Sequence, residues 1–387
     1  MRALNRLGGA AVLATAIVAA IGSPALAAAA HPAHRGAGWS GRSAVFVQTD
    51  NTAGNAVVSY HRAAGGTLTE EASYPTGGLG GVLTGSVVDH LASQGSLELD
   101  RAAGLLFAVN AGSNTLSVFG VNGTHLALRQ VIGSGGTFPV SLAVHGDLVY
   151  VLNAEDGGNV HGYRIVFGRL APIPGSTRQL GLDPSAAPQF LTTPGQAAFT
   201  RDGRQLVVTT KANGSDIDVF GVNSAGYLSA SPVVNSEPNA APFAITYDGS
   251  GHLVIAEAGT NAVATFVLSS SGTVTPLSVA GTGQAATCWV SRDGGTLFAS
   301  NAGSGNVSAV SDTGGVLSLR GQTATDGGTV DSAVTPGGRF LYVQAGAAGN
   351  IDEFTVGTAG ALTEVGSVSS WSAGTSGCYS AQTPTPD

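Results

Sequence analysis

A short unit of apolar strands and small polar turns recurs seven times along this chain of 387 residues. Each copy contains an apolar strand, a turn, a second strand and then Gly-x-Leu or a close variant. The apolar strands are AVFVQ from Ala44, LLFAVN from Leu105, LVYVLN from Leu148, LVVTTK from Leu206, LVIAEA from Leu253, LFASNA from Leu297 and FLYVQA from Phe340. The spacings are 61, 43, 58, 47, 43 and 44 residues when the aligned positions are Phe46, Phe107, Tyr150, Val208, Ile255, Phe298 and Tyr342. A period in the 40s with four short strands per copy predicts a β-propeller, whose sheets pack around one axis.

Tight turns precede six of the seven apolar strands. They contain Asp-Gly, Gly-Gly or similar pairs, which supply the positive φ of hairpin turns, at 100–104, 145–147, 201–204, 248–251, 292–295 and 336–339. The strand at Ala44 has no such partner before it, so its inner neighbour must come from the C-terminal segment 377–382. We therefore predict an all-β chain with hardly any helix. Its fold is a single seven-bladed β-propeller, closed by pairing of the C-terminal strand with the first blade, which leaves no open sheet edge.

The two longest spacings mark insertions. They follow the outermost strands of the first and third blades, at residues 75–95 and 175–195. Because successive strands alternate in direction, both insertions share one face with the turns between second and third strands. We call this the loop face. Long loops gathered on one face are often functional.

The N-terminus has the features of a secretory signal. Residues 1–27 contain Arg2 and Arg6, an apolar stretch and an Ala-Leu-Ala cleavage motif, and they are too short for a membrane span. We expect a signal peptide of the general secretory route over 1–27, a flexible linker over 28–42, the propeller over 43–382 and a disordered tail over 383–387. The protein is thus expected to be secreted.

The charge balance limits the partners. Removal of the signal peptide leaves 14 basic and 24 acidic residues, a net charge of −10. An acidic exported protein without basic runs is a poor candidate for binding nucleic acid or anionic lipid. A closed propeller has little exposed sheet edge, so we expect a monomer. The two cysteines, Cys288 and Cys378, could form a disulfide in an oxidising compartment, although both are expected on innermost strands of blades that are not neighbours.

Four longer phrases resemble a known family. They are LFAVNAGSNTLSVFGV from Leu106, LVYVLNAEDGGNVHGYRI from Leu148, GQAATCWVSRDGGTLFASNAGSGNVSAV from Gly283 and FLYVQAGAAGNIDEFTV from Phe340. They look like the lactonase-type seven-bladed propellers, and more closely like the exported actinobacterial branch, over about 43–382. Relatives include the propeller-type 6-phosphogluconolactonase and the fungal carboxymuconate lactonising enzyme. The resemblance implies opening or closing of a lactone ring without metal or other cofactor, by His, Arg and Glu side chains on one face.

The sequence departs from the catalytic motifs of these relatives. Where they carry Pro-His-x-His at the opening of an innermost strand, this chain has Phe138-Pro-Val-Ser-Leu142. Where they carry arginines, it has Gln196 and Gln284. These differences, and the acidic charge, argue against a phosphorylated sugar as the substrate.

Several polar residues at the ends of the second strands are candidate site residues. Asn110, Asn153 and Asn301 either bind substrate or cap the following turn through their own side chains. Lys211 and Glu257 break this pattern on adjacent blades. One interpretation is an ion pair between blades; the other is a catalytic pair, with Glu257 as general base and Lys211 stabilising an oxyanion.

His90 completes the predicted catalytic set. It follows Asp89 in the first insertion and could act as a base or proton shuttle at neutral pH, or could simply be solvated. Gln94, nearby at the opening of an innermost strand, joins Gln196, Gln284 and the three asparagines as candidate substrate-binding residues. A Glu with three Asn on one face superficially fits oxygen ligation of a cation, but Lys211 would oppose it, so no metal is expected.

The sequence therefore supports two hypotheses. The first is an exported lactonase-family protein that hydrolyses a non-phosphorylated lactone or related cyclic ester at the loop face. The alternative is a non-catalytic propeller that binds a glycan, a cell-wall fragment or a protein through that face, because fold alone does not fix function.

Overall fold

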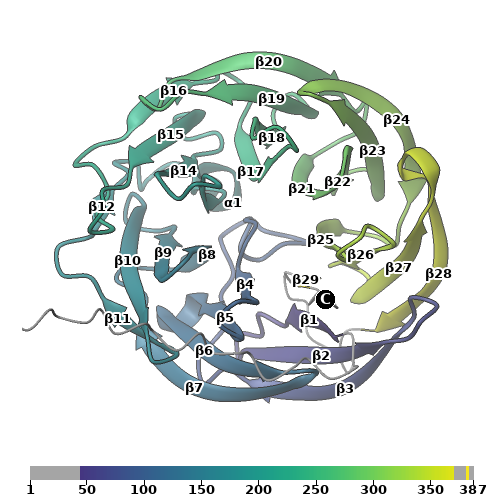
Figure 1. Ribbon diagram of the computed structural model, residues 1–387, viewed down its shortest axis with the longest axis horizontal. Helices are drawn as coiled ribbons and strands as arrows, with labels where there is room; N and C mark the ends of the chain where they lie inside the picture. Colours follow the sequence, from purple (N-terminus) through teal and green to yellow (C-terminus); the bar gives the residue numbers. More distant parts are fainter. Residues whose placement is uncertain (1–43, 370–380, 383–387) are drawn as a thin grey trace, which may run out of the picture. The chain divides into compact units, whose positions relative to one another are not determined.

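The computed structural model describes residues 44–369 and 381–382, all within the compact unit Gly36–Asp387. Seven sheets surround a central axis (Figure 1), which confirms the predicted seven-bladed β-propeller. Six sheets have four strands and one has five. Helix within the described residues is confined to α1 (Gln189–Thr192) and the 3-10 turns η1 (Ala111–Ser113) and η2 (Thr358–Gly360).

The strands of most blades run from the axis outward in chain order. The first three blades contain β29 (Ala381–Gln382), β1 (Ala44–Gln48), β2 (Ala56–Arg62) and β3 (Leu68–Pro75); β4 (Leu97–Asp100), β5 (Leu105–Asn110), β6 (Thr115–Asn122) and β7 (His125–Gly133); and β8 (Pro139–His145), β9 (Leu148–Asn153), β10 (Asn159–Val166), β11 (Arg169–Pro172) and β12 (Arg178–Gln179). The fourth and fifth contain β13 (Ala197–Phe199), β14 (Gln205–Thr209), β15 (Asp216–Gly221) and β16 (Val233–Ser236); and β17 (Pro242–Tyr247), β18 (Leu253–Glu257), β19 (Ala262–Leu268) and β20 (Val274–Gly281). The last two contain β21 (Thr287–Asp293), β22 (Thr296–Asn301), β23 (Asn306–Thr313) and β24 (Val316–Ala324); and β25 (Thr329–Val334), β26 (Phe340–Ala345), β27 (Asn350–Val356) and β28 (Leu362–Ser369).

The C-terminal strand β29 pairs with β1 in the first blade. The register places Phe46 opposite Gln382 and Val47 opposite Ala381 in an antiparallel pair. The first blade therefore takes its innermost strand from the far end of the chain, as the repeat predicted.

The second strand of each blade is buried on both faces because a neighbouring blade covers each face. All six residues of β5 are buried. Phe107 packs toward the third blade, whereas Leu106 and Ala108 pack toward the first. Outer strands alternate instead: β7 buries Leu126 and exposes its neighbours, because its other face meets solvent.

Two of the seven residues aligned by sequence are displaced by one position. In the fourth blade Val207, and not Val208, packs toward the following blade as Phe107 does. In the fifth blade the equivalent residue is Val254, and not Ile255. Apolar side chains occupy both faces of these strands, so the sequence did not show which face meets which neighbour.

The signal peptide, the linker, the start of the propeller at residue 43, the tail 383–387 and Cys378 lie outside the described residues. Cys288 has a buried free thiol. Among the described residues, no helix has the length and apolarity that crossing a bilayer requires.

Candidate functional site

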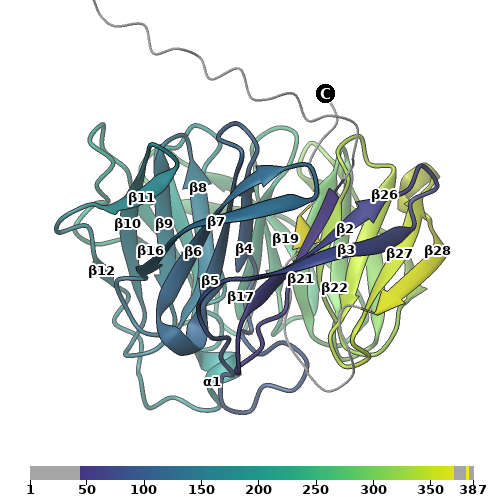
Figure 2. The same cartoon turned by 90° about the horizontal axis from the view of Figure 1, so that it is seen from below.

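The two long insertions meet on the loop face. The backbone N–H of Thr84, in the first insertion, donates to Gln189 Oε1 in the second, at 2.8 Å. A side chain at Gly85 would lie about 3.2 Å from Pro188 and Phe190, so the two segments are in close contact. In the side view of Figure 2, α1, which is part of the second insertion, lies at the bottom face of the ring, and β11 lies near the top face. We call residues 76–96 and 180–196 together the cap.

The first insertion also crosses the axis of the ring. The side chain of Gln94, which precedes β4 in the second blade, makes two hydrogen bonds with the backbone of Val290 in the sixth blade, at 3.0 and 3.1 Å. Trp289 Nε1 donates to Ser93 O at 2.9 Å, and Ser93 Oγ donates to Val140 O in the third blade, also at 2.9 Å. The cap is therefore fastened to blades on opposite sides of the axis, and this arrangement closes the loop-face end of the ring.

A ring of seven equivalent positions lies beneath the cap. Each position directly follows the last paired residue of a second strand: Asp50, Ala111, Ala154, Lys211, Ala258, Ala302 and Gly346. Five of them are Ala or Gly, and two are charged. Asp50 and Lys211 also differ in backbone, with φ of 46° and 53° in the left-handed region. This register corrects the sequence alignment: Thr210, and not Lys211, shares the position of Asn110.

Lys211 joins the two insertions. Its Nζ donates to Ala92 O in the first insertion at 2.7 Å, and to Phe190 O and Thr193 Oγ1 in the second at 2.9 and 3.1 Å. The ring of Phe243 lies 5.3 Å from the same atom, in cation–π contact. Lys211 is only 2% exposed. In its charged form, Lys211 thus uses all three ammonium protons to hold the cap.

His90 faces Asp50 across a short gap. Its Nδ1 lies 3.8 Å from Asp50 Oδ2, and the two side chains are 11% and 0% exposed. Neither of these two atoms has a hydrogen-bond partner. Asp50 Oδ1 accepts from the N–H of Gly81 in the cap at 3.3 Å. The sequence suggested Asp89 as the carboxylate near His90, but Asp89 uses its carboxylate to accept the N–H groups of Leu91 and Ser93 within the insertion.

Burial changes the proton affinity of each of these groups. Burial raises the pKa of Asp50 well above its usual value. The negative charge of Asp89 raises this pKa further, whereas the hydrogen bond from the Gly81 N–H lowers it. Burial lowers the pKa of His90. It also lowers the pKa of Lys211 to about 7, although the negative charge of Asp89 opposes this change. We call Asp50, Asp89, His90 and Lys211 the buried charge cluster.

The cluster contains groups suited to accepting and donating protons. A neutral imidazole can accept a proton, and a protonated carboxyl beside it can donate one. Buried ionisable groups destabilise a fold unless they are paired, so strongly shifted groups gathered beneath the cap point to a functional site. The sequence pointed to His90 and Lys211 but not to Asp50. Asp50 stands out only in the structure, where its position is equivalent to one held by Ala or Gly in five of the other blades.

Glu257 lies outside the cluster. Its Oε2 accepts from Thr260 Oγ1 at 2.6 Å, within the turn that follows its own strand. Burial raises the pKa of Glu257, and the charge that acts on it comes from Glu237. No ion pair joins it to Lys211, although both belong to the described part of the chain. The predicted ion pair between the two blades is therefore wrong, because the Lys211 ammonium is directed to the cap.

The three asparagines are buried and bonded to nearby turns and strands. Asn110 Oδ1 accepts from Asn55 Nδ2 of the first blade at 3.0 Å, and Asn153 Nδ2 donates to Ser134 O at 3.3 Å. Asn110 Nδ2 donates to Thr115 Oγ1 and Ser117 Oγ. Asn301 Nδ2 donates to Asn306 Oδ1 and Ser308 Oγ, and Asn153 Nδ2 bonds Asn159 in the same way. These contacts fit the capping interpretation rather than substrate binding.

The three glutamines have different surroundings. Gln196 Oε1 accepts the N–H of Ile245 at 2.6 Å, beside an irregularity in the pairing of β17. Gln94 makes a similar contact with Val290 in β21, as described above. Gln284 is half-buried and accepts from Asn306 Nδ2 at 2.6 Å. Gln94 and Gln196 therefore satisfy backbone groups of innermost strands.

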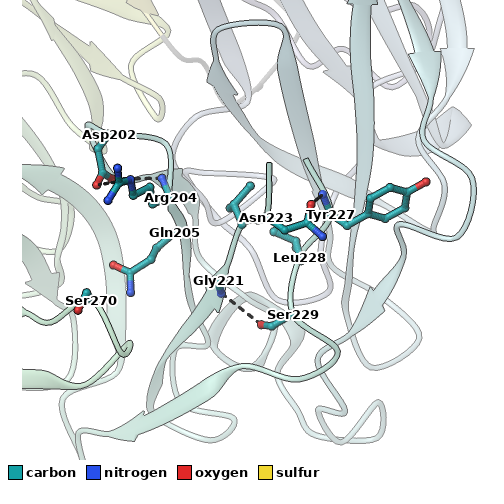
Figure 3. Close-up of a pocket in the computed structure, with 10 residues that line it drawn as sticks. Asp202, Arg204, Gln205, Gly221, Asn223, Tyr227, Leu228, Ser229 and Ser270 are labelled. Atoms are coloured by element: carbon teal, nitrogen blue, oxygen red, sulfur yellow. Dashed lines mark hydrogen bonds and ion pairs between the residues drawn. The ribbon is translucent and has the colours of Figure 1, made fainter. Parts of the chain in front are cut away.

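Two cavities are lined by residues other than those of the cluster. One, of about 440 Å³, opens on the face opposite the cap, at the fourth blade. Figure 3 shows Asp202 and Arg204 side by side there and Tyr227 directed away from them. The other, of about 130 Å³, lies on the loop face beside α1 and includes Glu155, Asp183 and Thr193. Within residues 44–369, no three His, Cys, Asp or Glu side chains are grouped to hold a metal ion.

Comparison with known proteins agrees with this architecture. Residues 97–378 match the family described as Lactonase, 7-bladed beta-propeller. The structure of the periplasmic gluconolactonase of Pseudomonas aeruginosa is 17% identical, with a TM-score of 0.69 over 89% of this chain and 100% of that one. A protein of Bacteroides fragilis, assigned as a 6-phosphogluconolactonase, is 19% identical, with a TM-score of 0.68 over 88% and 98%.

These two structural likenesses show the fold alone, since their identities are low. Among curated proteins, none matches this sequence. The match to the family covers well over half of the chain, and it begins at β4, the first strand of the second blade. This protein therefore belongs to the lactonase family of seven-bladed β-propellers.

Proposed function

We propose that this protein is an exported hydrolase of a non-phosphorylated lactone, with His90 as general base and Asp50 as the acid that faces it. The observation that carries the proposal is the position of Asp50 and His90. Two buried, mutually facing titratable groups have polar atoms without partners, beneath the cap that Lys211 fastens. Such atoms are rare in folded proteins because leaving them unbonded is unfavourable.

The chemistry of hydrolysis fits these two groups. Neutral His90 takes a proton from water as the oxygen attacks the acyl carbon, and the ring C–O bond breaks. The Asp50 carboxyl gives its proton to the departing alkoxide, and the proton on His90 then returns to Asp50. The products are a hydroxyl and a carboxylic acid, so all atoms balance. In this proposal Lys211 holds the cap in place, and substrate enters when residues 76–96 move.

The absence of a phosphate in the substrate follows from charge. The full chain has a net charge of −8, and the lysine of the cluster already donates its protons to the cap. A phosphorylated lactone would bring negative charge that no free cation of the cluster could neutralise. The gluconolactonase named among the structural neighbours is periplasmic, which supports the proposal of an exported enzyme for an unphosphorylated lactone.

A panel of lactones tests this function. We expect purified protein without residues 1–27 to release protons from at least one unphosphorylated sugar or alkyl lactone, and to act much more slowly on its phosphorylated counterpart. His90→Ala should abolish the release while the protein remains folded by circular dichroism. Proton release that is unaffected by His90→Ala would place the chemistry elsewhere.

A second candidate is a binding protein without catalysis, and one observation favours it. The cap seals the cluster, whereas the 130 Å³ cavity beside α1 is open on the loop face and is lined by Glu155, Asp183, Gln189 and Asn213. Such carboxylates and amides suit the hydroxyl groups of a carbohydrate ligand. No turnover across the panel, together with a glycan whose binding Asn213→Ala removes, would favour this function.

A further inference from the structure

The hairpin tip between β10 and β11 exposes an aromatic side chain in a strained conformation. Val166 pairs with Arg169, so Phe167 and Gly168 form a two-residue turn. Their φ angles are 50° and 71°, as in a type I′ turn. Phe167 is 99% exposed. A bulky residue at such an angle is an outlier, because its Cβ crowds the backbone.

The corresponding turn in the sixth blade shows what the fold alone requires. There Thr313 pairs with Val316, and the two turn residues are Gly314 and Gly315, with φ of 62° and 88°. Glycine adopts these angles without strain. Phe167 therefore costs backbone energy at the tip and recovers none by packing, so selection for stability does not account for it. Strain retained at an exposed tip points to a role in binding.

Two arginines without carboxylate partners flank this phenylalanine. The guanidinium of Arg129, from β7, lies against the turn: a side chain at Gly168 would come within 2.3 Å of its Nη1. Arg169 directly follows the turn and is also exposed. Among the ion pairs within 44–369, none involves either arginine. Val166 adds further apolar surface, at 43% exposed.

We propose that this tip, formed by Arg129, Val166, Phe167 and Arg169, docks the protein on an anionic lipid surface. An aromatic ring enters the boundary between headgroups and acyl chains, while arginines beside it bind lipid phosphates. The overall acidic charge disfavours such a surface, but the tip presents two unpaired positive charges at one point. The tip joins β10 to β11 on the face of the ring opposite α1 and the cap (Figure 2). Docking through the tip therefore leaves the loop face free.

Vesicle sedimentation tests the proposal. We expect the protein without residues 1–27 to bind vesicles of phosphatidylglycerol and phosphatidylcholine at low salt, and to bind pure phosphatidylcholine at least tenfold more weakly. Because only one ring and two charges are involved, binding should need millimolar lipid and should disappear in 0.5 M salt, roughly the range in which surface charges are screened. Phe167→Asn should lower the partition coefficient about tenfold, which corresponds to about 1.4 kcal/mol.

Stability separates docking from a structural role. Asparagine tolerates the left-handed region, so Phe167→Asn should leave the midpoint of urea unfolding unchanged or raise it. Gly314→Asn, at the equivalent turn of the sixth blade, is the matched control and should bind vesicles like the wild type. Equal binding to neutral and anionic vesicles, no binding to either, or full binding by Phe167→Asn would overturn the proposal. Capture of another protein through Phe167 in place of vesicles would equally overturn it.

Discussion

Deleting residues 376–387 is expected to leave the protein unable to fold. The deletion removes β29, which pairs with β1 at Phe46 and Val47 and supplies the innermost strand of the first blade. All five residues of β1 are buried, and each large apolar side chain that becomes exposed costs about 1.5–3 kcal/mol. The free energy of unfolding of a typical domain is only about 5–15 kcal/mol. Circular dichroism and size exclusion should show an expanded or aggregated chain without a cooperative melt.

Deleting only residues 383–387 is the control for this experiment. This shorter deletion keeps β29, so we expect a melting temperature close to that of the full chain. A folded, cooperative protein lacking 376–387 would show that the first blade does not depend on its C-terminal strand, and it would contradict closure of the ring by that pairing.

Replacing Lys211 with Met is expected to cost the second-largest amount of stability, about 2–4 kcal/mol. Methionine fills much of the same space but donates no protons, so Ala92 O, Phe190 O and Thr193 Oγ1 lose their donor in a buried site. Urea unfolding measures the loss. Hydrogen exchange should rise most in 83–93 and 189–193, since Lys211 joins these two segments. Exchange that rises evenly over all blades would contradict the role of Lys211 in holding the cap.

The stability lost in Lys211→Met is also expected to depend on pH. The pKa of Lys211 is about 7 in the folded protein and near 10.5 in the unfolded chain, since burial disfavours the charged form. Between these values the unfolded chain binds the extra proton, so the wild type gains stability as pH rises, by at most about 1.4 kcal/mol per pH unit. The deficit of Lys211→Met should therefore grow from pH 7 to pH 10. A constant deficit over this range would mean that Lys211 does not titrate there.

Glu257→Gln is the matched control for Lys211. An ion pair between them would couple their effects, whereas the structure has each residue bonded to separate groups. We expect the losses in the double variant Lys211→Met/Glu257→Gln to add to within about 0.5 kcal/mol. A coupling well above that figure would restore the ion pair.

The architecture was predictable because it rests on repetition. Seven copies of one strand pattern fixed the number of blades, and the strand at Ala44 without an inner partner predicted the pairing of β29 with β1. Register within the fourth and fifth blades was less predictable. Val207 and Val208 are both buried, and so are Val254 and Ile255, so hydrophobic pattern could not assign their faces.

The site was predictable only in part, because the apolar pattern could not assign the register of the fourth blade. A one-residue shift placed Lys211 level with Asn110, whereas the structure puts it one residue further on, with a left-handed backbone that aims it at the cap. Asp50 resembled an ordinary turn residue in Thr49-Asp50-Asn51, and only the three-dimensional equivalence with Lys211 distinguishes it. The partners of Lys211 are backbone carbonyls of Ala92 and Phe190, which no sequence motif identifies.

The most direct test of the proposed site compares Asp50→Asn with Glu257→Gln in the lactone assay. Asparagine has nearly the shape of aspartate but cannot donate an acidic proton, so kcat/KM should fall by about 10²–10⁴ while the protein stays folded. Glu257→Gln should keep kcat/KM within about twofold of the wild type, because its carboxylate bonds only within its own turn. Loss of turnover in Glu257→Gln with full activity in Asp50→Asn would contradict the assignment of the buried charge cluster as the active site.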